Sequence, residues 1–335
     1  MNYDKPFLTY KDQILLLRKR GLIIEDEQLA TQILSTVSYY DIINRYKSHY
    51  MPIDNIFIDN ITIEYLYLLF LFDKNLQAYI MKYSMLVENI FKTKFAYIMS
   101  NHFGVDYSLY LNSKNYKSNI ANLTFIDVKK EIDKGLLPKN IKNPSKHYMN
   151  NHNHLPPWIF LKNVSLGTSI NLFRLLIPKY KCILANSLIP HKNLTYKDKI
   201  NLVKNTLTTI RLFRNCAAHN LNFTDFRIQN KYKPSIVNLH KVLGHSLIKK
   251  SHNQISKNDK QSINGLYGCV LSILVLLNDN FLRAQFVIEL LSIFEVQSMN
   301  KYVVLKDYLS ITQMPDNINE RFRDYYVKLC ANRNY

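Results

Sequence analysis

Apolar side chains between residues 61 and 101 recur at steps of three and four residues, and this periodicity constrains the fold more than any other feature. The positions that carry the period are Leu76, Ile80, Tyr83, Val87, Phe91 and Phe95. Such steps place side chains on one face of an amphipathic α-helix. Gly104 lies just beyond the segment, where a glycine is suited to end a helix. The sequence therefore predicts one long helix, or two consecutive ones, over residues 61–101.

Shorter helices are predicted on both sides of this segment. Thr9 lies three residues before Asp12, and Thr195 lies three residues before Asp198, which is the spacing of a capping box at a helix start. Further helical patterns cover residues 9–20, 26–35, 158–176, 263–277 and 281–294. Neither the two-residue alternation of a strand nor an internal repeat stands out. We therefore expect an all-α fold.

The composition along the chain indicates three parts. We expect an N-terminal helical segment over residues 1–60, a helical core over 61–225 and a C-terminal helical extension over 226–335. Asn, Lys, Ser, His and Pro dominate residues 112–157, where apolar periodicity is lost. This stretch predicts a basic surface insertion in the core with at most one helix, near residues 125–134.

Glycine and cysteine usage excludes several classes of protein. Only 7 of the 335 residues are Gly, roughly a third of average usage, and no phosphate-binding loop or dinucleotide fingerprint occurs. Four cysteines are scattered without a CxxC spacing, which favours a reducing cytoplasm. Three histidines, at positions 147, 152 and 154, lie in an Asn-rich stretch without the framing of a metal site. We expect neither a metal ion nor a cofactor.

The charge predicts a polyanionic partner. Lys and Arg number 44 against 25 Asp and Glu, which gives a formal charge of +19. Such an excess favours nucleic acid, with an anionic membrane surface as the weaker alternative. Codon usage of an A+T-rich genome is a further explanation of part of the lysine excess. The apolar runs 65–72 and 269–277 are too short to span a membrane and are predicted to be core, and the polar N-terminus lacks a secretory signal.

The helix predicted from Tyr196 carries an arginine where its pattern calls for a core residue. Its apolar positions recur at steps of three and four residues, at Ile200, Val203, Leu207, Ile210 and Ala217. Arg214 occupies the position of this stripe between Ile210 and Ala217. A guanidinium on a packing face costs several kcal/mol unless it has a carboxylate, a partner subunit or a phosphate. Arg214 is therefore the first candidate for a functional residue.

Asn215 and His219 lie four residues apart on the same predicted helix, so their side chains are neighbours. Ala217 and Ala218 keep the surface low, which suits a groove or a dimer interface. Histidine transfers protons near neutral pH, and arginine binds phosphate and stabilises developing charge. Because RNA carries its own nucleophile in the 2′-hydroxyl, these groups suffice for cleavage without a metal ion. One Arg–His pair is half of such a site, or a minimal one.

Residues 214–219, with the sequence RNCAAH, resemble the R-x4-6-H motif of HEPN-domain ribonucleases. Residues 5–24, the Tyr39–Tyr40 pair, residues 72–99 and residues 156–168 resemble the Abi_2 family, the abortive-infection group that includes AbiD and AbiF proteins. The resemblance spans about residues 5–225. It implies a bacterial antiphage protein with a HEPN-like helical bundle that cleaves RNA, and a symmetric dimer that joins two motifs.

The resemblance also implies roles for residues around the motif. Arg214, Asn215 and His219 would be catalytic, and Glu88 matches an acidic residue that would brace the basic pair. We assign a supporting role to Arg211 and RNA contacts to Lys92 and Arg174. The family commonly has a second His and an RLWNR-like run after the motif, whereas residues 220–223 here are NLNF. This departure leaves substrate choice and full activity open.

Three alternatives remain at this point. Arg214 is a structural residue if it simply pairs with Glu88 beside a satisfied histidine, and Glu88 with Lys92 is an ordinary i,i+4 ion pair. The chain is a non-catalytic RNA-binding scaffold, regulated by a structured RNA, if the fold has lost turnover. The third alternative is a membrane-perturbing effector that uses residues 263–294. The leading hypothesis is a cytoplasmic, homodimeric ribonuclease with RNA as substrate and no membrane partner.

Overall fold

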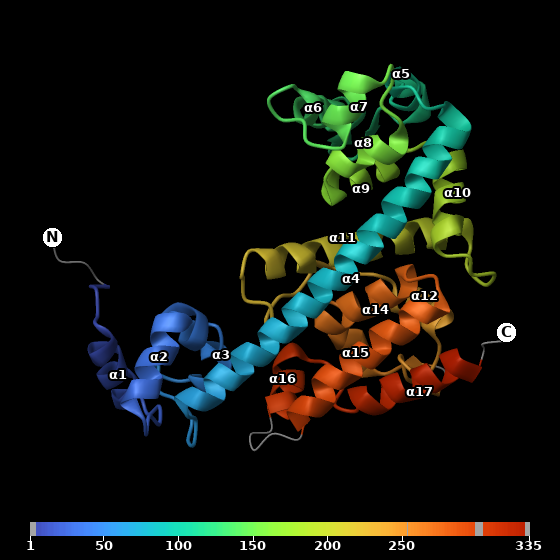
Figure 1. The fold of residues 1–335 in the computed structure, drawn as a ribbon. Coiled ribbons are helices and arrows are strands. Elements are labelled where there is room, and N and C mark those ends of the chain that lie inside the picture. Colours follow the sequence, from blue (N-terminus) through green and yellow to red (C-terminus); the bar gives the residue numbers. More distant parts are fainter. Residues whose placement is uncertain (1–4, 253, 299–303, 332–335) are drawn as a thin grey trace.

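The computed structural model describes residues 5–252, 254–298 and 304–331 (Figure 1). Its main element is α4 (Ile63–Phe103), a single helix of 41 residues. The Thr62 hydroxyl accepts a hydrogen bond from the Tyr65 amide at its start, and Gly104 ends it with a φ of +98°. Positive φ strains residues that carry a Cβ atom, so glycine fits this end. The predicted long helix is confirmed, in its unbroken form.

The N-terminal segment packs beside the first turns of α4 (Figure 1). Thr9 and Asp12 form the expected capping box at the start of α1, and Gly21 follows this helix with a φ of +86°. The Ile63 amide donates to the Ile23 carbonyl oxygen over 3.2 Å, which joins this segment to the start of α4. The elements are α1 (Tyr10–Lys19), α2 (Glu27–Thr36), the π-helical turn η1 (Tyr40–Asn44) and α3 (Lys47–Tyr50).

Short elements cover the opposite end of α4 (Figure 1). The helix predicted near residues 125–134 is confirmed as α6, whose Val128 and Ile132 side chains are buried. The prediction of at most one helix over 112–157 is wrong, because α7 and other short elements form there. A helix of seven residues is too short to show a clear period. The elements are α5 (Tyr107–Tyr110), η2 (Ser113–Asn115), β1 (Asn119–Ile120), β2 (Leu123–Thr124), α6 (Phe125–Leu136) and α7 (Ser145–Asn151).

The pattern over residues 158–176 corresponds to two helices, α8 (Pro157–Asn163) and α9 (Leu166–Leu175). Ser165 separates them because its hydroxyl accepts the Thr168 amide over 3.0 Å and caps α9. Pro178 does follow the end of the pattern, but it also begins α10 (Pro178–Leu188), which the sequence did not predict. The helix predicted from the Thr195–Asp198 signal is confirmed as α11 (Tyr196–Ala218).

The C-terminal part packs around α14 (Leu266–Leu276), in which every residue is buried. The helices predicted over 263–277 and 281–294 are confirmed as α14 and α15. The polar stretch before them also contains short helices that the sequence did not predict. The remaining elements are η3 (Asn230–Tyr232), α12 (Ile236–Leu243), β3 (Lys250–Ser251), β4 (Gln254–Ile255), α13 (Lys257–Ser262), α15 (Asn280–Ser298), α16 (Val304–Thr312) and α17 (Ile318–Ala331).

The all-α fold class is confirmed. In the described ranges, sheet structure is limited to two hairpins of two-residue strands, β1–β2 and β3–β4. The apolar run 269–277 is core, as predicted, because its side chains are buried within the C-terminal part. No helix among the described residues combines the length and the apolar character that a membrane-crossing segment needs.

Candidate functional site

Helix α11 carries the predicted motif and packs against α4, α9, α10 and α14. Its buried stripe runs through Val203, Leu207, Ile210, Phe213 and Cys216. The prediction that Arg214 occupies a core position is therefore wrong. The stripe continues from Ile210 to Phe213, by a step of three, and Arg214 lies beside it with 34% of its side chain exposed.

Glu88 on α4 lies between two cations. Its Oε2 atom is 3.7 Å from Nη2 of Arg214, and its Oε1 atom is 2.6 Å from Nζ of Lys92. Glu88 thus contacts Arg214 and also forms the i,i+4 pair with Lys92, and its role as a brace of the basic pair stays a prediction. The Arg214 contact is a loose ion pair rather than a bidentate one, so most of the five guanidinium N–H donors stay available to a ligand.

Lys92 is held inside the protein. Besides Glu88, its ammonium group donates to the Val164 carbonyl oxygen at the start of the turn into α9 over 2.6 Å. Only 13% of its side chain is exposed. These contacts make Lys92 a link between α4 and the turn into α9, and its predicted contact with RNA stays a prediction.

His219 is the C-cap residue of α11, and its side chain is exposed. The helix ends in a Schellman motif, in which the Asn220 amide donates to the Ala217 carbonyl oxygen over 3.2 Å and the Leu221 amide donates to Cys216 over 3.0 Å. Asn220 supplies the left-handed residue that this motif requires, with a φ of +52°. The backbone on both sides of the His219 ring is therefore fixed, while the ring itself faces solvent.

Asn215 contributes its backbone to the same helix end. Its carbonyl oxygen accepts the His219 amide over 3.0 Å, and its side chain is partly exposed. Within the described ranges, the side-chain amide of Asn215 makes no hydrogen bond to His219 or to another residue. Its role in orienting His219 stays a prediction.

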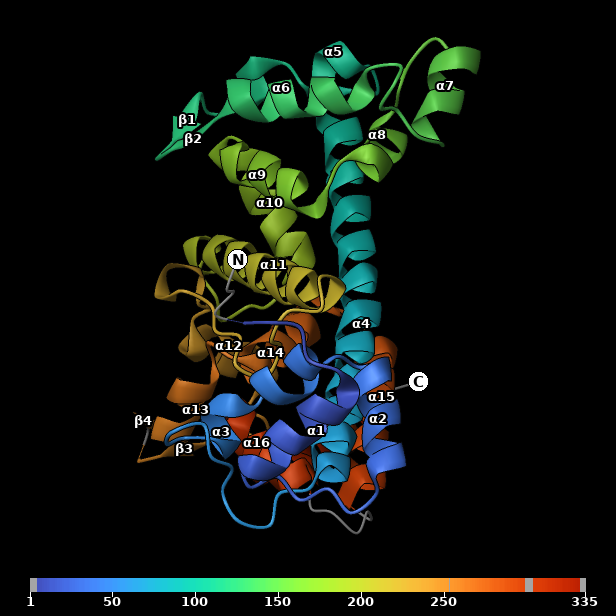
Figure 2. The ribbon, with the colours of Figure 1, turned by 90° about the vertical axis from the view of Figure 1, so that its left-hand side faces the viewer.

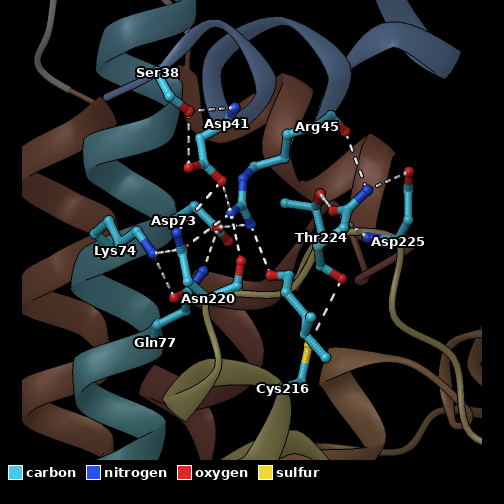
Figure 3. A network of polar contacts seen from close by, with 12 residues as sticks. Ser38, Asp41, Arg45, Asp73, Lys74, Gln77, Cys216, Asn220, Thr224 and Asp225 are labelled. Carbon is cyan, nitrogen blue, oxygen red and sulfur yellow. Dashed lines mark hydrogen bonds and ion pairs between the residues drawn. The ribbon is translucent and has the colours of Figure 1, made fainter. Parts of the chain in front are cut away.

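Arg45 of the N-terminal segment holds the turn that follows His219 (Figure 3). Its guanidinium donates to the Leu221 carbonyl oxygen over 2.9 Å and to both oxygens of Asn220 over 3.1 Å. The same group contacts the Asp41 carboxylate over 3.1 Å and the Asp73 carboxylate over 3.4 Å. We refer to Arg45, Asp41, Asp73 and Asn220 as the Arg45 clamp. It fixes the backbone of the two residues that follow His219.

Asp73 is the buried anion of the Arg45 clamp, on α4 (Figure 3). Its Oδ2 atom accepts from Gln77 over 2.6 Å, and its Oδ1 atom accepts the Tyr308 hydroxyl over 2.7 Å. Complete burial raises the pKa of Asp73, against the lowering effect of Tyr308 and Arg45. Because Tyr308 lies on α16, the network joins all three segments expected from the sequence.

The cysteine within the motif is not a nucleophile at neutral pH. Burial, and then the negative charge of Asp73, raises the pKa of the Cys216 thiol to about 11. The thiol is therefore protonated, and its Sγ atom lies 3.7 Å from the Asn222 carbonyl oxygen. Arg214 and His219, by contrast, both reach solvent.

Sequence reasoning missed Arg45 and Asp73. A signal was present for Asp73, since it follows Leu69 by four residues and precedes Leu76 by three on the buried stripe of α4. A carboxylate on a core stripe needs a buried cation as its partner, just as a buried guanidinium needs a carboxylate. Arg45 gave no comparable signal, because it lies at the end of the short π-helical turn η1, where no helical stripe is defined.

The other two residues predicted to contact RNA or to support the site, Arg211 and Arg174, lie outside the motif. Arg211 on α11 and Arg174 on α9 both line one hollow, together with Gly167. The Arg211 side chain lies against Gly167, where α9 and α11 approach each other. Arg174 donates to the Asn171 side chain over 3.1 Å. These two residues therefore belong to a second feature next to the motif.

No cluster of three or more His, Cys, Asp or Glu side chains among the described residues is arranged to hold a metal ion. His147 and His152 lie close, with ring centroids 6.0 Å apart, but His147 is engaged by the Asn151 side chain.

Comparison with known proteins adds one finding. A family model described as Abi-like protein (Abi_2) matches residues 32–225, more than half of the chain. The match contains Arg45, Asp73, Glu88 and the whole motif, and it ends where the predicted resemblance ends. No curated protein and no solved structure matches the chain.

Proposed function

Because the chain belongs to the Abi-like protein family, we propose that it is an RNA-cleaving effector of bacterial abortive infection that acts without a metal ion. The observation that carries this proposal is the end of α11, where His219 is exposed and Arg214 is held by a single ion pair of 3.7 Å. Both groups are thereby free to meet a ligand, and the Arg45 clamp keeps the helix end rigid. The formal charge of +19 supports a polyanionic substrate.

The proposed reaction uses the 2′-hydroxyl of RNA as the nucleophile. The 2′-oxygen attacks the neighbouring phosphorus, and the bond from phosphorus to the 5′-oxygen breaks. A histidine removes the proton of the 2′-hydroxyl, and a protonated histidine returns one to the 5′-oxygen. Arg214 binds the phosphate and stabilises its developing charge, and Asn215 orients the reacting groups. The products are a 2′,3′-cyclic phosphate and a 5′-hydroxyl.

This reaction favours two copies of the chain. Arg214 and His219 are five residues apart, which on an α-helix is a rotation of about 140°, so the two side chains of one copy diverge. One histidine also serves poorly as both base and acid in the same step. A second copy related by two-fold symmetry supplies the complementary pair. Leu221, two residues after the motif and 54% exposed, gives this helix end an apolar surface for the contact.

The test is cleavage of cellular RNA by the purified protein with EDTA present. Wild type is compared with Arg214→Ala and His219→Ala, and the cut ends are mapped. Matched controls are Arg323→Ala and His245→Ala, which remove the same side-chain types from exposed positions outside the motif. We expect wild type and both controls to produce cyclic-phosphate and 5′-hydroxyl ends, and both motif variants to lose cleavage by at least about 100-fold.

Two outcomes contradict the proposal. If the motif variants cleave as fast as the controls, Arg214 and His219 are not the catalytic groups. If wild type binds RNA and leaves it intact under all conditions, including in extracts of infected cells, the protein is a non-catalytic RNA-binding scaffold. Sedimentation of wild type and of Leu221→Glu tests the second copy, because a charge at the apolar contact should dissociate the dimer and abolish cleavage together.

A further inference from the structure

A basic hollow of about 510 Å³ lies between the β1–β2 hairpin and helices α9 and α11. Its walls are the turn between β1 and β2, helix α9, helix α11 and the short turn η3. Figure 2 shows the hairpin, α9 and α11 on the same side of α4. Four cations line it, and no Asp or Glu is among the lining residues: Arg174, Lys204, Arg211 and Lys231.

The cations of the basic hollow lack counter-ions. In the described part of the chain, none of the four lies within 4.0 Å of a carboxylate, and Arg174 alone has a side-chain acceptor, the neutral Asn171. Burial, and then the charge of Arg174, lowers the pKa of Lys204. Burial and the nearby cations also lower the pKa of Lys181, behind Arg174, to about 8. The free protein therefore holds like charges together at a cost that a bound anion removes.

The shape of the basic hollow favours a nucleic acid strand over a membrane. A concave site between two parts of a protein does not admit a flat lipid surface, whereas it admits a single strand. Tyr232 lines the hollow and holds the Lys231 ammonium 4.9 Å from its ring centroid, so a cation and an aromatic ring lie together there. Asn122 and Asn171 offer amides that pair with base edges.

The basic hollow is continuous with the motif along α11. Arg211 lines the hollow, and Arg214 lies three residues further along the same helix, which makes the two side chains neighbours. The helix advances about 12 Å from Arg211 to His219. We propose that the basic hollow binds the phosphates of single-stranded RNA beside the linkage that is cut, which rests on the proposed function. Lys204 and Lys231 are new RNA-contacting residues in this proposal, and Arg174 and Arg211 bind with them.

The test measures binding without cleavage. A fluorescent 12-nucleotide RNA is titrated with the His219→Ala protein at several salt concentrations, with and without Lys204→Gln and Lys231→Gln together. The matched control removes two exposed lysines elsewhere, Lys192→Gln with Lys257→Gln, so that net charge is equal. Loss of two phosphate contacts should lower the salt slope by about 1.4 and weaken binding about 25-fold at 0.1 M salt. The control should change binding less than about twofold.

Folding does not obscure this comparison. Because the cations repel one another, the variant of the basic hollow should melt at or above the temperature of its parent. Binding by this variant that equals binding by the control overturns the proposal. Competition by adenosine monophosphate separates the two sources of phosphate: if the mononucleotide binds as tightly as the 12-mer, the ligand is a small nucleotide and the strand proposal is wrong.

The results also separate this proposal from the proposed function. If wild type leaves RNA intact but the basic hollow carries its binding, the ribonuclease fails and the RNA site stands. If wild type cleaves RNA and the Lys204/Lys231 variant binds and cleaves like the control, the ribonuclease stands and the RNA site fails.

Discussion

Substitution of Asp73 by Asn tests the Arg45 clamp. The change keeps the size of the side chain and removes a fully buried carboxylate that contacts Arg45. Breaking a buried ion pair from one side leaves an uncompensated charge and costs about 3–5 kcal/mol. For a chain of this length, an unfolding entropy of about 2.1 cal/mol/K per residue converts this loss to a fall of about 4–7 °C in melting temperature.

Two controls bracket the result. Tyr308→Phe removes one hydrogen bond to Asp73 and should cost about 1.5–3 kcal/mol. Glu27→Gln breaks an exposed ion pair with Arg18 and should cost less than about 1 kcal/mol. Calorimetry or urea unfolding orders the three variants. Hydrogen exchange of the Leu221 amide reports the local effect, because loss of the clamp should release the turn after His219.

The reasoning is refuted if Asp73→Asn costs no more than Glu27→Gln. That outcome means that the carboxyl group is neutral in the folded protein, so that the Arg45 clamp is not ionic. A large loss of stability without faster exchange at Leu221 is equally informative, because Arg45 would then stabilise the fold without fixing the helix end.

Two further predictions concern pH and packing. The pKa of Lys181 is lowered to about 8, so above pH 8 this amine is mostly deprotonated in the folded protein but stays protonated in the unfolded chain up to about pH 10.4. The free energy of unfolding should therefore rise with pH in this window, and urea unfolding of Lys181→Met from pH 8 to 10 should show a smaller rise than wild type. Equal slopes for the two proteins would count against this reasoning. At Gly268, a Cβ atom would lie 1.8 Å from the Ile263 carbonyl oxygen, so Gly268→Ala should lower the free energy of unfolding by about 3 kcal/mol. At Gly135 on α6 a Cβ atom would meet no atom within 4 Å, so Gly135→Ala should stabilise the protein by about 0.5–1 kcal/mol. Similar melting temperatures for the two variants would contradict this.

The parts of the fold that the sequence predicted are those governed by local rules. The period of α4 and the caps at Thr9 and Thr195 depend on residues within a few positions of one another. The error at Arg214 arose because steps of three and four are equally allowed. From Ile210 the stripe reaches either Phe213 or Arg214, and only the packing of α11 against its neighbours decides between them.

The parts that were missed depend on contacts between distant segments. Asp73 meets Arg45 across 28 residues and Tyr308 across 235, and no spacing in one sequence contains those pairings. The basic hollow likewise draws on segments from residue 121 to residue 232. In the sequence its four cations resemble ordinary surface charges, and only the fold shows that they gather where no Asp or Glu is among the lining residues. Short helices such as α7 and α12 are formed by packing, since seven or eight residues carry little helical stability of their own.

The length of α4 determines how far its end moves when the helix tilts. A helix of 41 residues is about 60 Å long, so a tilt of 5° about its first turn moves its last turn by about 5 Å. Arg45 pairs with Asp73 in the first third of this helix, and the short elements around the β1–β2 hairpin lie at its C-terminal end (Figures 1 and 2). Because α11, α10 and α14 also pack against α4, any rearrangement that tilts α4 must shift the helix that carries the motif with it.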